Sequence, residues 1–168
     1  MPVRVQTEDF DLTGEVAKLR AAQGERAAQI GAIATFIGTV RDINDGSGVA
    51  AMTLEHYPGM TERALEAILT QARSRWDIYD ALVIHRVGTL HPQDQIVLVV
   101  TLGAHRGEAF AACEFIMDYL KTQAPFWKKE QTPSGERWVD ARGSDDAAAA
   151  KWGIAPQGGD GSSTQGDE

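Results

Sequence analysis

Three lysines stand around an apolar cluster in the stretch KTQAPFWKK, residues 121–129, and two of them, Lys121 and Lys128, could do chemistry. At about 100° of rotation per residue, the helix predicted upstream has one apolar stripe, and Lys121 falls beside that stripe rather than opposite it. The stripe consists of Phe110, Cys113, Met117 and Leu120. We therefore expect the Lys121 side chain to point toward the packed side. A partly desolvated lysine has a lowered pKa, and its free amine can serve as a nucleophile or as a general acid and base.

Both lysines also fit purely structural roles. Positive charge is favourable at the C-terminal end of a helix, and a lysine stem can lie along apolar surface while the ammonium stays in water. Lys128 follows an X-Pro step and two aromatic residues, which predicts an extended backbone held by the packing of Phe126 and Trp127. It could equally be a surface lysine next to core aromatics. The spacing alone leaves both interpretations open.

A second basic group lies in TLGAHRGEAF, residues 101–110, where a buried strand is predicted to give way to a helix. The strand is expected to end at Gly103, His105 and Arg106 occupy the turn, and Gly107 opens the helix. Unpaired amides at a helix N-terminus attract anions, and an arginine offers a bidentate fork to phosphate. The pattern predicts an anion site; the alternative is that His105 and Arg106 are exposed turn residues.

Two more arginines stand at the ends of predicted strands. Arg41 lies where a strand meets the loop RDINDGSG, a usual place for a ligand-contacting group, and Arg142 follows the last predicted strand. Either could be an ordinary solvated arginine. The histidines lack metal-ligand spacing, and His85 within a strand is expected to be structural. The only cysteine, Cys113, permits no disulfide framework and is expected to be a buried, inert thiol. We expect no metal and no bound cofactor.

The composition predicts one domain followed by an acidic tail. With 168 residues, of which 43% are hydrophobic, the chain can bury one core. We expect residues 1–142 to form a single domain and residues 143–168, rich in glycine, serine and acids, to be largely disordered.

The charge and the apolar runs exclude several classes of partner. Of the net charge of −8, the tail supplies −4, with five acids against one base, and the body holds 15 bases against 19 acids. Such a body argues against general binding of nucleic acid or of anionic membranes. No apolar run approaches the ~20 residues of a membrane span, and the start shows no apolar signal region. We expect a cytoplasmic protein.

The elements that must position these residues follow from periodicity and turn residues. One helix is expected after Gly59, with Thr61 as its cap, and another from Gly107 to about Lys121. The first two strands are expected to pair with each other, and the third and fourth are joined across TLHPQD. The order predicts an α+β domain with helices packed on a largely antiparallel sheet. The strands are predicted at residues 27–40, 49–57, 80–88, 95–103 and 135–141.

Six motifs resemble one known family in their order and spacing. The motifs are FIGTVRD, LEHYPGMTERAL, HRVGTLHPQD, GAHRGEAF, MDYLKTQAPFWKKE and GERWVDAR. From about residue 5 to Trp152 the chain resembles the large catalytic subunits of molybdopterin synthase. The resemblance implies an α/β hammerhead-type domain with an additional antiparallel β-sheet, which is compatible with the predicted element order.

The same resemblance implies a sulfurtransferase reaction. In that family, two sulfurs are added to cyclic pyranopterin monophosphate as a dithiolene, with opening of the cyclic phosphate. The sulfur arrives as a thiocarboxylate on the C-terminal Gly-Gly of a small ubiquitin-like subunit. Two large subunits form a central homodimer with one small subunit at each end, which makes a heterotetramer.

Residue by residue, the resemblance implies a site. Lys121 in DYLKT matches the catalytic lysine, and Lys128 in PFWKK matches a second active-site lysine. The substrate-binding positions are matched by Arg41, His105, Arg106 and Arg142, the last of which the resemblance assigns to the pocket of the neighbouring subunit. A competing hypothesis is a noncatalytic docking module for a ubiquitin-like tail or a phosphate-bearing ligand. A phosphate-handling hydrolase has no support from paired carboxylates or a metal cluster.

Overall fold

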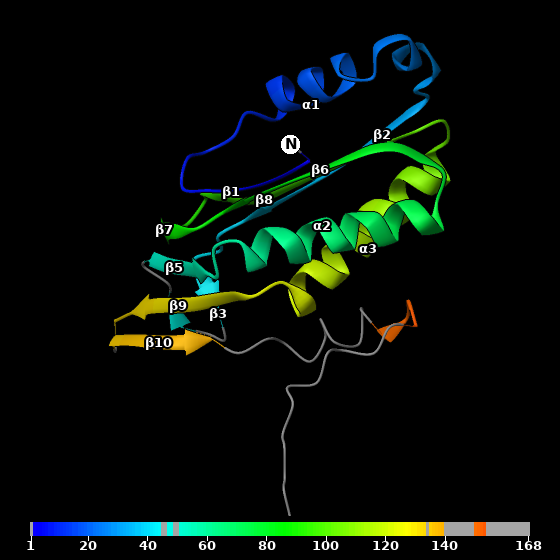
Figure 1. Cartoon of the computed structure of the whole chain (residues 1–168). Helices are drawn as coiled ribbons and strands as arrows, with labels where there is room; N and C mark the ends of the chain where they lie inside the picture. The colour runs from blue at the N-terminus through cyan, green and yellow to red at the C-terminus, as the bar shows by residue number, and fades with distance from the viewer. Residues whose placement is uncertain (1, 45–46, 49–50, 134, 140–149, 154–168) are drawn as a thin grey trace, which may run out of the picture.

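The computed structural model describes residues 2–44, 47–48, 51–133, 135–139 and 150–153. Within them, two four-stranded sheets carry the architecture (Figure 1). The main sheet has the order β1 (Val3–Gln6), β6 (Ile78–Arg86), β8 (Gln95–Gly103), β2 (Ala32–Thr39). The small sheet has the order β10 (Gly135–Val139), β9 (Phe126–Thr132), β5 (Ala51–His56), β7 (Gly88–Leu90). A two-residue pair, β3 (Ile43–Asn44) and β4 (Ser47–Gly48), follows β2.

Helices cover both faces of the main sheet (Figure 1). On one face, α1 (Leu12–Ala21) and the 3₁₀ helix η1 (Gly24–Gln29) lie over a cluster that includes Leu82 and Leu98. On the other face, α2 (Met60–Arg75) and α3 (Arg106–Gln123) pack on a larger cluster. Because both faces are covered, β8 is buried from Val97 to Gly103, as its apolar run predicted. These elements confirm an α+β fold.

Strand direction fixes which residues share an end of the sheet. β2 and β6 both run antiparallel to β8, so both finish where β8 begins. α3 starts just after β8 ends and runs back along the sheet, packing on β8 and β2. The last turn of α3 therefore lies at the end of the sheet where β2 and β6 finish. Its first turn lies at the opposite end.

The expected pairing of the first two strands is wrong. β2 pairs with β8 in the main sheet, whereas β5 pairs with β7 and β9 in the small sheet. The first strand is also shorter than predicted, because residues 24–29 form η1 and the strand begins only at Ala32. The antiparallel pairing of β6 with β8 and the two long helices agree with the prediction. β1, α1 and β9 were not predicted as elements.

Two side chains have other environments than their spacing indicated. Gly59, not Thr61, caps α2: its φ is 82°, and its N–H donates to Glu62 Oε2 at 2.6 Å. Thr61 is instead fully buried, and its hydroxyl is hydrogen-bonded to the backbone of Tyr57 and of Pro125. Phe110 is 65% exposed rather than packed. α3 packs on β8 and on β2, the edge strand of the main sheet.

Part of the predicted tail lies against the helices. Trp152 packs edge-on against Trp76, with ring centroids 5.3 Å apart, and against Phe115 at 5.6 Å. Its indole N–H donates to Asp118 Oδ2 at 2.6 Å. Residues 143–149 and 154–168 lie outside the described residues. None of the helices in the described part of the chain has the length and apolar character needed to span a bilayer.

Candidate functional site

Lys121 and Arg41 lie at the same end of the main sheet. Lys121 is in the last turn of α3, and Arg41 comes two residues after β2 ends. Both are exposed. Lys121 is therefore not packed against the core as the helix spacing predicted, although its positive charge is felt by the buried ring of His85. The Lys121 side chain therefore lies at the surface of the chain.

Lys128 faces the space between the two sheets. In the antiparallel register, it stands opposite Leu54, and Phe126 stands opposite His56, so these four side chains share one face of the small sheet. Leu54 is buried, which identifies this face as the inner one. Lys128 is half-buried there, two residues from the turn that joins α3 to β9. Three predicted basic residues thus belong to one region.

His85 lies close to these lysines, because its ring stacks on Phe126 and is affected by the charge of Lys121. Its ring is 5% exposed and stacks on Phe126, with centroids 3.8 Å apart and planes at 18°. Nδ1 lies 2.8 Å from the Arg86 carbonyl oxygen; since a carbonyl only accepts, Nδ1 carries the proton. Burial, aided by the nearby charge of Lys121, lowers the pKa of His85 to about 4. At neutral pH the ring is therefore uncharged beside the lysine.

His105 and Arg106 lie at the other end of α3. His105 is the N-cap residue, Arg106 begins the helix, and both are exposed. Between Arg106 and Lys121 the helix advances ~22 Å at 1.5 Å per residue. One copy of the chain therefore separates His105 and Arg106 from the lysines. Arg142 lies outside the described residues.

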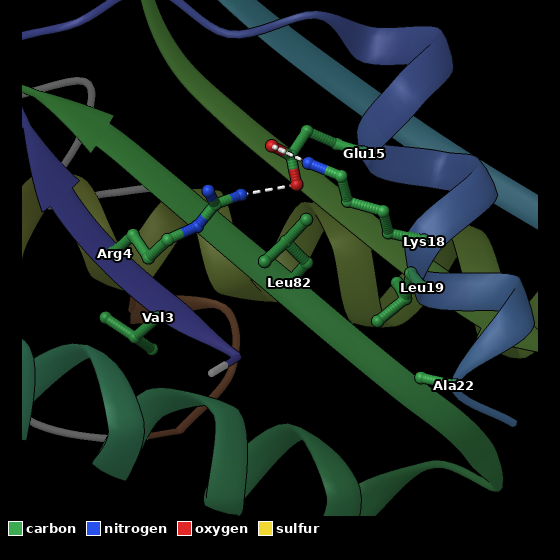
Figure 2. Close-up of a pocket in the computed structure, with 7 residues that line it drawn as sticks. All are labelled: Val3, Arg4, Glu15, Lys18, Leu19, Ala22 and Leu82. Carbon is green, nitrogen blue, oxygen red and sulfur yellow. Dashed lines mark ion pairs between the residues drawn. The ribbon is translucent and has the colours of Figure 1, made fainter.

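A pocket of about 490 Å³ belongs to neither end of α3. It lies between α1 and the main sheet, on the face away from α3, and none of the predicted site residues line it (Figure 2). Arg4 and Lys18 form ion pairs with Glu15 at its rim. The hydrogen bond from Arg4 lowers the pKa of Glu15, and this ion pair links β1 to α1.

The thiol of Cys113 is buried in the folded chain. It is 7% exposed, and burial raises its pKa to about 11. A protonated, buried thiol is a poor nucleophile, in agreement with its predicted position on the apolar stripe. Among the described residues, no three His, Cys, Asp or Glu side chains gather as a metal site would require.

Sequence reasoning did not connect Thr61 and His85 with the lysines. Thr61 was interpreted as a helix cap and His85 as a structural histidine, and both in fact contact the turn that leads from α3 into β9. No local pattern carries this information, because Thr61 bonds a residue 64 positions away and His85 stacks on a residue in the same distant turn. The one available signal was a histidine that directly follows the apolar run Ala81–Ile84 of β6.

Comparisons with known proteins agree on one family. The family model described as MoaE protein matches residues 5–123. A protein of Ralstonia nicotianae named molybdopterin synthase catalytic subunit is 68% identical over 152 residues, covering 90% of this chain and 84% of the relative.

Solved structures give the same result. The MoaE protein of Burkholderia ambifaria aligns with a TM-score of 0.76 at 63% identity, covering 90% of this chain and 97% of that one. Molybdopterin synthase from Staphylococcus aureus aligns with a TM-score of 0.74 at 26% identity, covering 83% and 98%. The chain belongs to the MoaE protein family.

Proposed function

We propose that the chain is the catalytic subunit of molybdopterin synthase. In this reaction, two sulfurs pass from the C-terminal thiocarboxylate of a small ubiquitin-like subunit to cyclic pyranopterin monophosphate and form the molybdopterin dithiolene. The relatives of this chain support the assignment, since the Ralstonia protein bears the name of this subunit. The observation that carries it is the gathering of Lys121, Lys128 and Arg41 at one end of the fold.

The state of Cys113 supports an external sulfur source. The only cysteine of the chain is buried, and its pKa of about 11 keeps it protonated. A sulfurtransferase without an available thiol of its own needs a donor that brings the sulfur. The thiocarboxylate of a partner protein meets that need, which favours a two-subunit enzyme over a self-contained one.

The positions of the two lysines suit different tasks. Lys121 is exposed and can meet a tail inserted from a partner, whereas Lys128 is half-buried between the sheets. A lysine amine here can assist attack of the thiocarboxylate on the pterin, transfer a proton, or resolve an acyl intermediate with the partner tail. Arg41 at the same end offers its guanidinium to the substrate phosphate.

A homodimer would bring His105 and Arg106 to the lysines. These residues lie ~22 Å from Lys121 in their own chain, farther than one fused-ring pterin with a single phosphate can reach. α3 lies beside β2, the outermost strand of the main sheet, and the two run in the same direction. A two-fold axis at the middle of this edge would place the first turn of α3 from one copy beside the last turn from the other. We place the phosphate site in that junction, with Arg142 contributing to it.

The surface at this edge has the character of a contact between copies. Ile33 and Phe36 on β2 are 39% and 41% exposed, and Phe110 on α3 is 65% exposed. An open strand edge with large apolar side chains is costly to leave in water and favours self-association. We propose that a second copy covers it and that one small subunit binds at each end, in a heterotetramer located in the cytoplasm. The two sheets would then correspond to the hammerhead-type domain and its additional sheet.

A single-turnover assay tests this function. Purified chain, a thiocarboxylated ubiquitin-like partner and cyclic pyranopterin monophosphate should give the dithiolene product, measured by mass spectrometry. Lys121→Ala should lose product by at least ~100-fold. The matched control is Lys18→Ala, an exposed lysine on α1 at the opposite face of the main sheet. Tight partner binding without any product from the wild-type chain would instead favour the docking module.

A further inference from the structure

Buried polar side chains are concentrated at the ends of α3. Among the described residues, the buried polar or charged side chains are Thr61, His85 and Thr101. Thr101 donates its hydroxyl to the Ala109 carbonyl at 2.7 Å and so holds the first turns of α3 on β8. The other two contact the turn that follows the last turn of α3. Burying a polar group is costly unless it is bonded, so such groups are informative about which geometry is being fixed.

Thr61 joins three segments at this turn. Its hydroxyl accepts the N–H of Tyr57 at 3.0 Å and donates to the Pro125 carbonyl at 3.3 Å. The first bond fixes the exit from β5, and the second ties the start of α2 to the chain between α3 and β9. Thr61 has no exposed surface, so water cannot replace either bond without opening the core.

His85 holds the next residue of the same turn. Phe126 lies under the His85 ring in a near-parallel stack, and its N–H closes a tight turn onto the Ala124 carbonyl at 2.9 Å. The ring cannot rotate freely, because its Nδ1–H is bonded to the Arg86 carbonyl. The main sheet thereby sets the position at which β9 begins.

We propose that Thr61 and His85 are positioning residues that hold the 124–126 turn and so set the separation of Lys121 and Lys128. Lys121 lies three residues before this turn, and Lys128 lies two residues after it on an extended strand. The turn is the covalent link between the two lysines. The two residues that hold it, here called the clamp, are Thr61 on α2 and His85 on β6. The inference rests on the proposed function for the role of the lysines, but the geometry it describes can be measured without turnover.

Two pairs of variants distinguish the contacts of Thr61 and His85 with the turn from the volume of these side chains. Thr61→Val keeps the volume and deletes both hydrogen bonds, whereas Thr61→Ser keeps the hydroxyl. His85→Ala removes the stack, whereas His85→Phe keeps a ring over Phe126. Thr101→Val is the matched control, because it makes the same change at an equally buried threonine at the other end of α3.

The first readout is cross-linking of Lys121 to Lys128 with amine reagents of graded length, mapped by mass spectrometry. With the shortest reagent that joins them in the wild-type chain, Thr61→Val and His85→Ala should lose most of the cross-link. Thr61→Ser, His85→Phe and the Thr101→Val control should keep it. Added imidazole should restore the cross-link in His85→Ala by filling the vacated site.

The second readout is the single-turnover rate at saturating partner and substrate. Thr61→Val and His85→Ala should lower it at least ~10-fold, since small displacements of a reacting group are costly. Thr61→Ser and His85→Phe should stay within about threefold of wild type. Thermal melting identifies the folded variants. If Thr61→Val does not fold, the test is the loss of the cross-link in His85→Ala and its recovery with imidazole.

Unchanged cross-linking in folded Thr61→Val and His85→Ala would overturn the proposal, whatever their stability. An equal loss in Thr101→Val would also overturn it, because general loosening of the core would then explain the result. A wild-type chain without sulfur transfer would refute the proposed function alone, since the cross-link still reports on the clamp.

Discussion

The state of individual side chains in this protein follows from burial more than from residue type. His85 and Cys113 both have ordinary pKa values near the physiological range, and burial moves them in opposite directions, to about 4 and about 11. In each case the uncharged form is favoured, as expected for groups removed from water. The charged groups of the proposed site, Lys121 and Arg41, are by contrast exposed. Lys128 is half-buried between the sheets, and the buried His85 and Cys113 are neutral.

The pKa of His85 predicts a loss of stability in mild acid. In the unfolded chain His85 titrates at its ordinary value of 6.5, so between pH 6.5 and about 4 the unfolded state binds more protons than the folded state. The contribution of His85 to the free energy of unfolding is therefore fully present above pH 6.5. It is lost as the pH falls from 6.5 to about 4. Between pH 7 and pH 5 the loss should be about 2 kcal/mol, at 1.36 kcal/mol per pKa unit.

Urea unfolding of the wild-type chain and of His85→Phe at pH 7, 6 and 5 measures this loss. The variant should show a flatter dependence, because its ring does not titrate. Asp9 and Glu15, whose pKa values are lowered by hydrogen bonds from Gln95 and Arg4, lose stabilisation at lower pH in both proteins and cancel in the comparison. Parallel curves for the two proteins would refute the assignment of the loss to His85.

The burial of Cys113 predicts that its sulfur takes no part in the reaction. Cys113→Ala should keep the single-turnover rate within about threefold of wild type, with a stability loss of about 1 kcal/mol for the vacated volume. The native thiol should resist alkylation at pH 8 and react fully in urea, as measured by mass spectrometry. Loss of product in a folded Cys113→Ala would mean that the thiol carries sulfur, contrary to the proposal.

At the level of elements, α3 organises the molecule, because its two ends carry different groups of basic residues. Its periodicity and the apolar run of β8 were strong signals, and both elements were predicted correctly. The predicted length of this helix already implied the distance between Arg106 and Lys121. The sequence could not supply the location of β2 at the sheet edge or the exposure of Phe110.

The elements that were not predicted depend on distant partners. β5 was expected to pair with the strand before it, but its register is set by β7 and by β9, which lies more than 60 residues later. α1 has no fully buried residue, and its apolar side chains Leu12, Val16 and Leu19 are only partly buried against the sheet. β9 contains charged residues on both of its faces, Lys128 inside and Lys129 outside, where Lys129 pairs with Glu136 at 2.7 Å. Strand patterns of this kind are not visible before the neighbours are known.

The junction between β2 and the turn before α3 gives a test at this scale. A Cβ on Gly31 would lie 2.2 Å from the Ala104 carbonyl oxygen, so Gly31→Ala must displace backbone where β2 starts. We expect a loss of about 1–3 kcal/mol in the free energy of unfolding. Gly107→Ala, in the first turn of α3 with open space around it, is the control and should gain about 0.4–1 kcal/mol. Thermal melting of both variants checks the pair; similar shifts in both would contradict the close approach of Gly31 to Ala104.

At the level of the whole molecule, the separation of the two basic groups distinguishes a site within one chain from a site shared by two. Suppose that Lys121 of one copy works with Arg106 of the other. In a mixed dimer of Lys121→Ala with Arg106→Ala, one site then carries both substitutions and the other carries neither. If the two residues served the same site within one chain, each site of the mixed dimer would carry one substitution. Only a shared site allows two inactive proteins to restore activity together.

Mixing therefore gives a sharp prediction. Each variant alone should be nearly inactive in the single-turnover assay, whereas random exchange of subunits should restore about a quarter of the wild-type sites, since half of the dimers are mixed and each has one intact site. The control is Lys121→Ala mixed with Lys128→Ala, whose residues lie at the same end of one chain. That mixture should stay inactive, because every site retains one substitution. Recovery in the control, or its absence in the first mixture despite proven subunit exchange, would refute the shared site and with it the two-fold contact across β2.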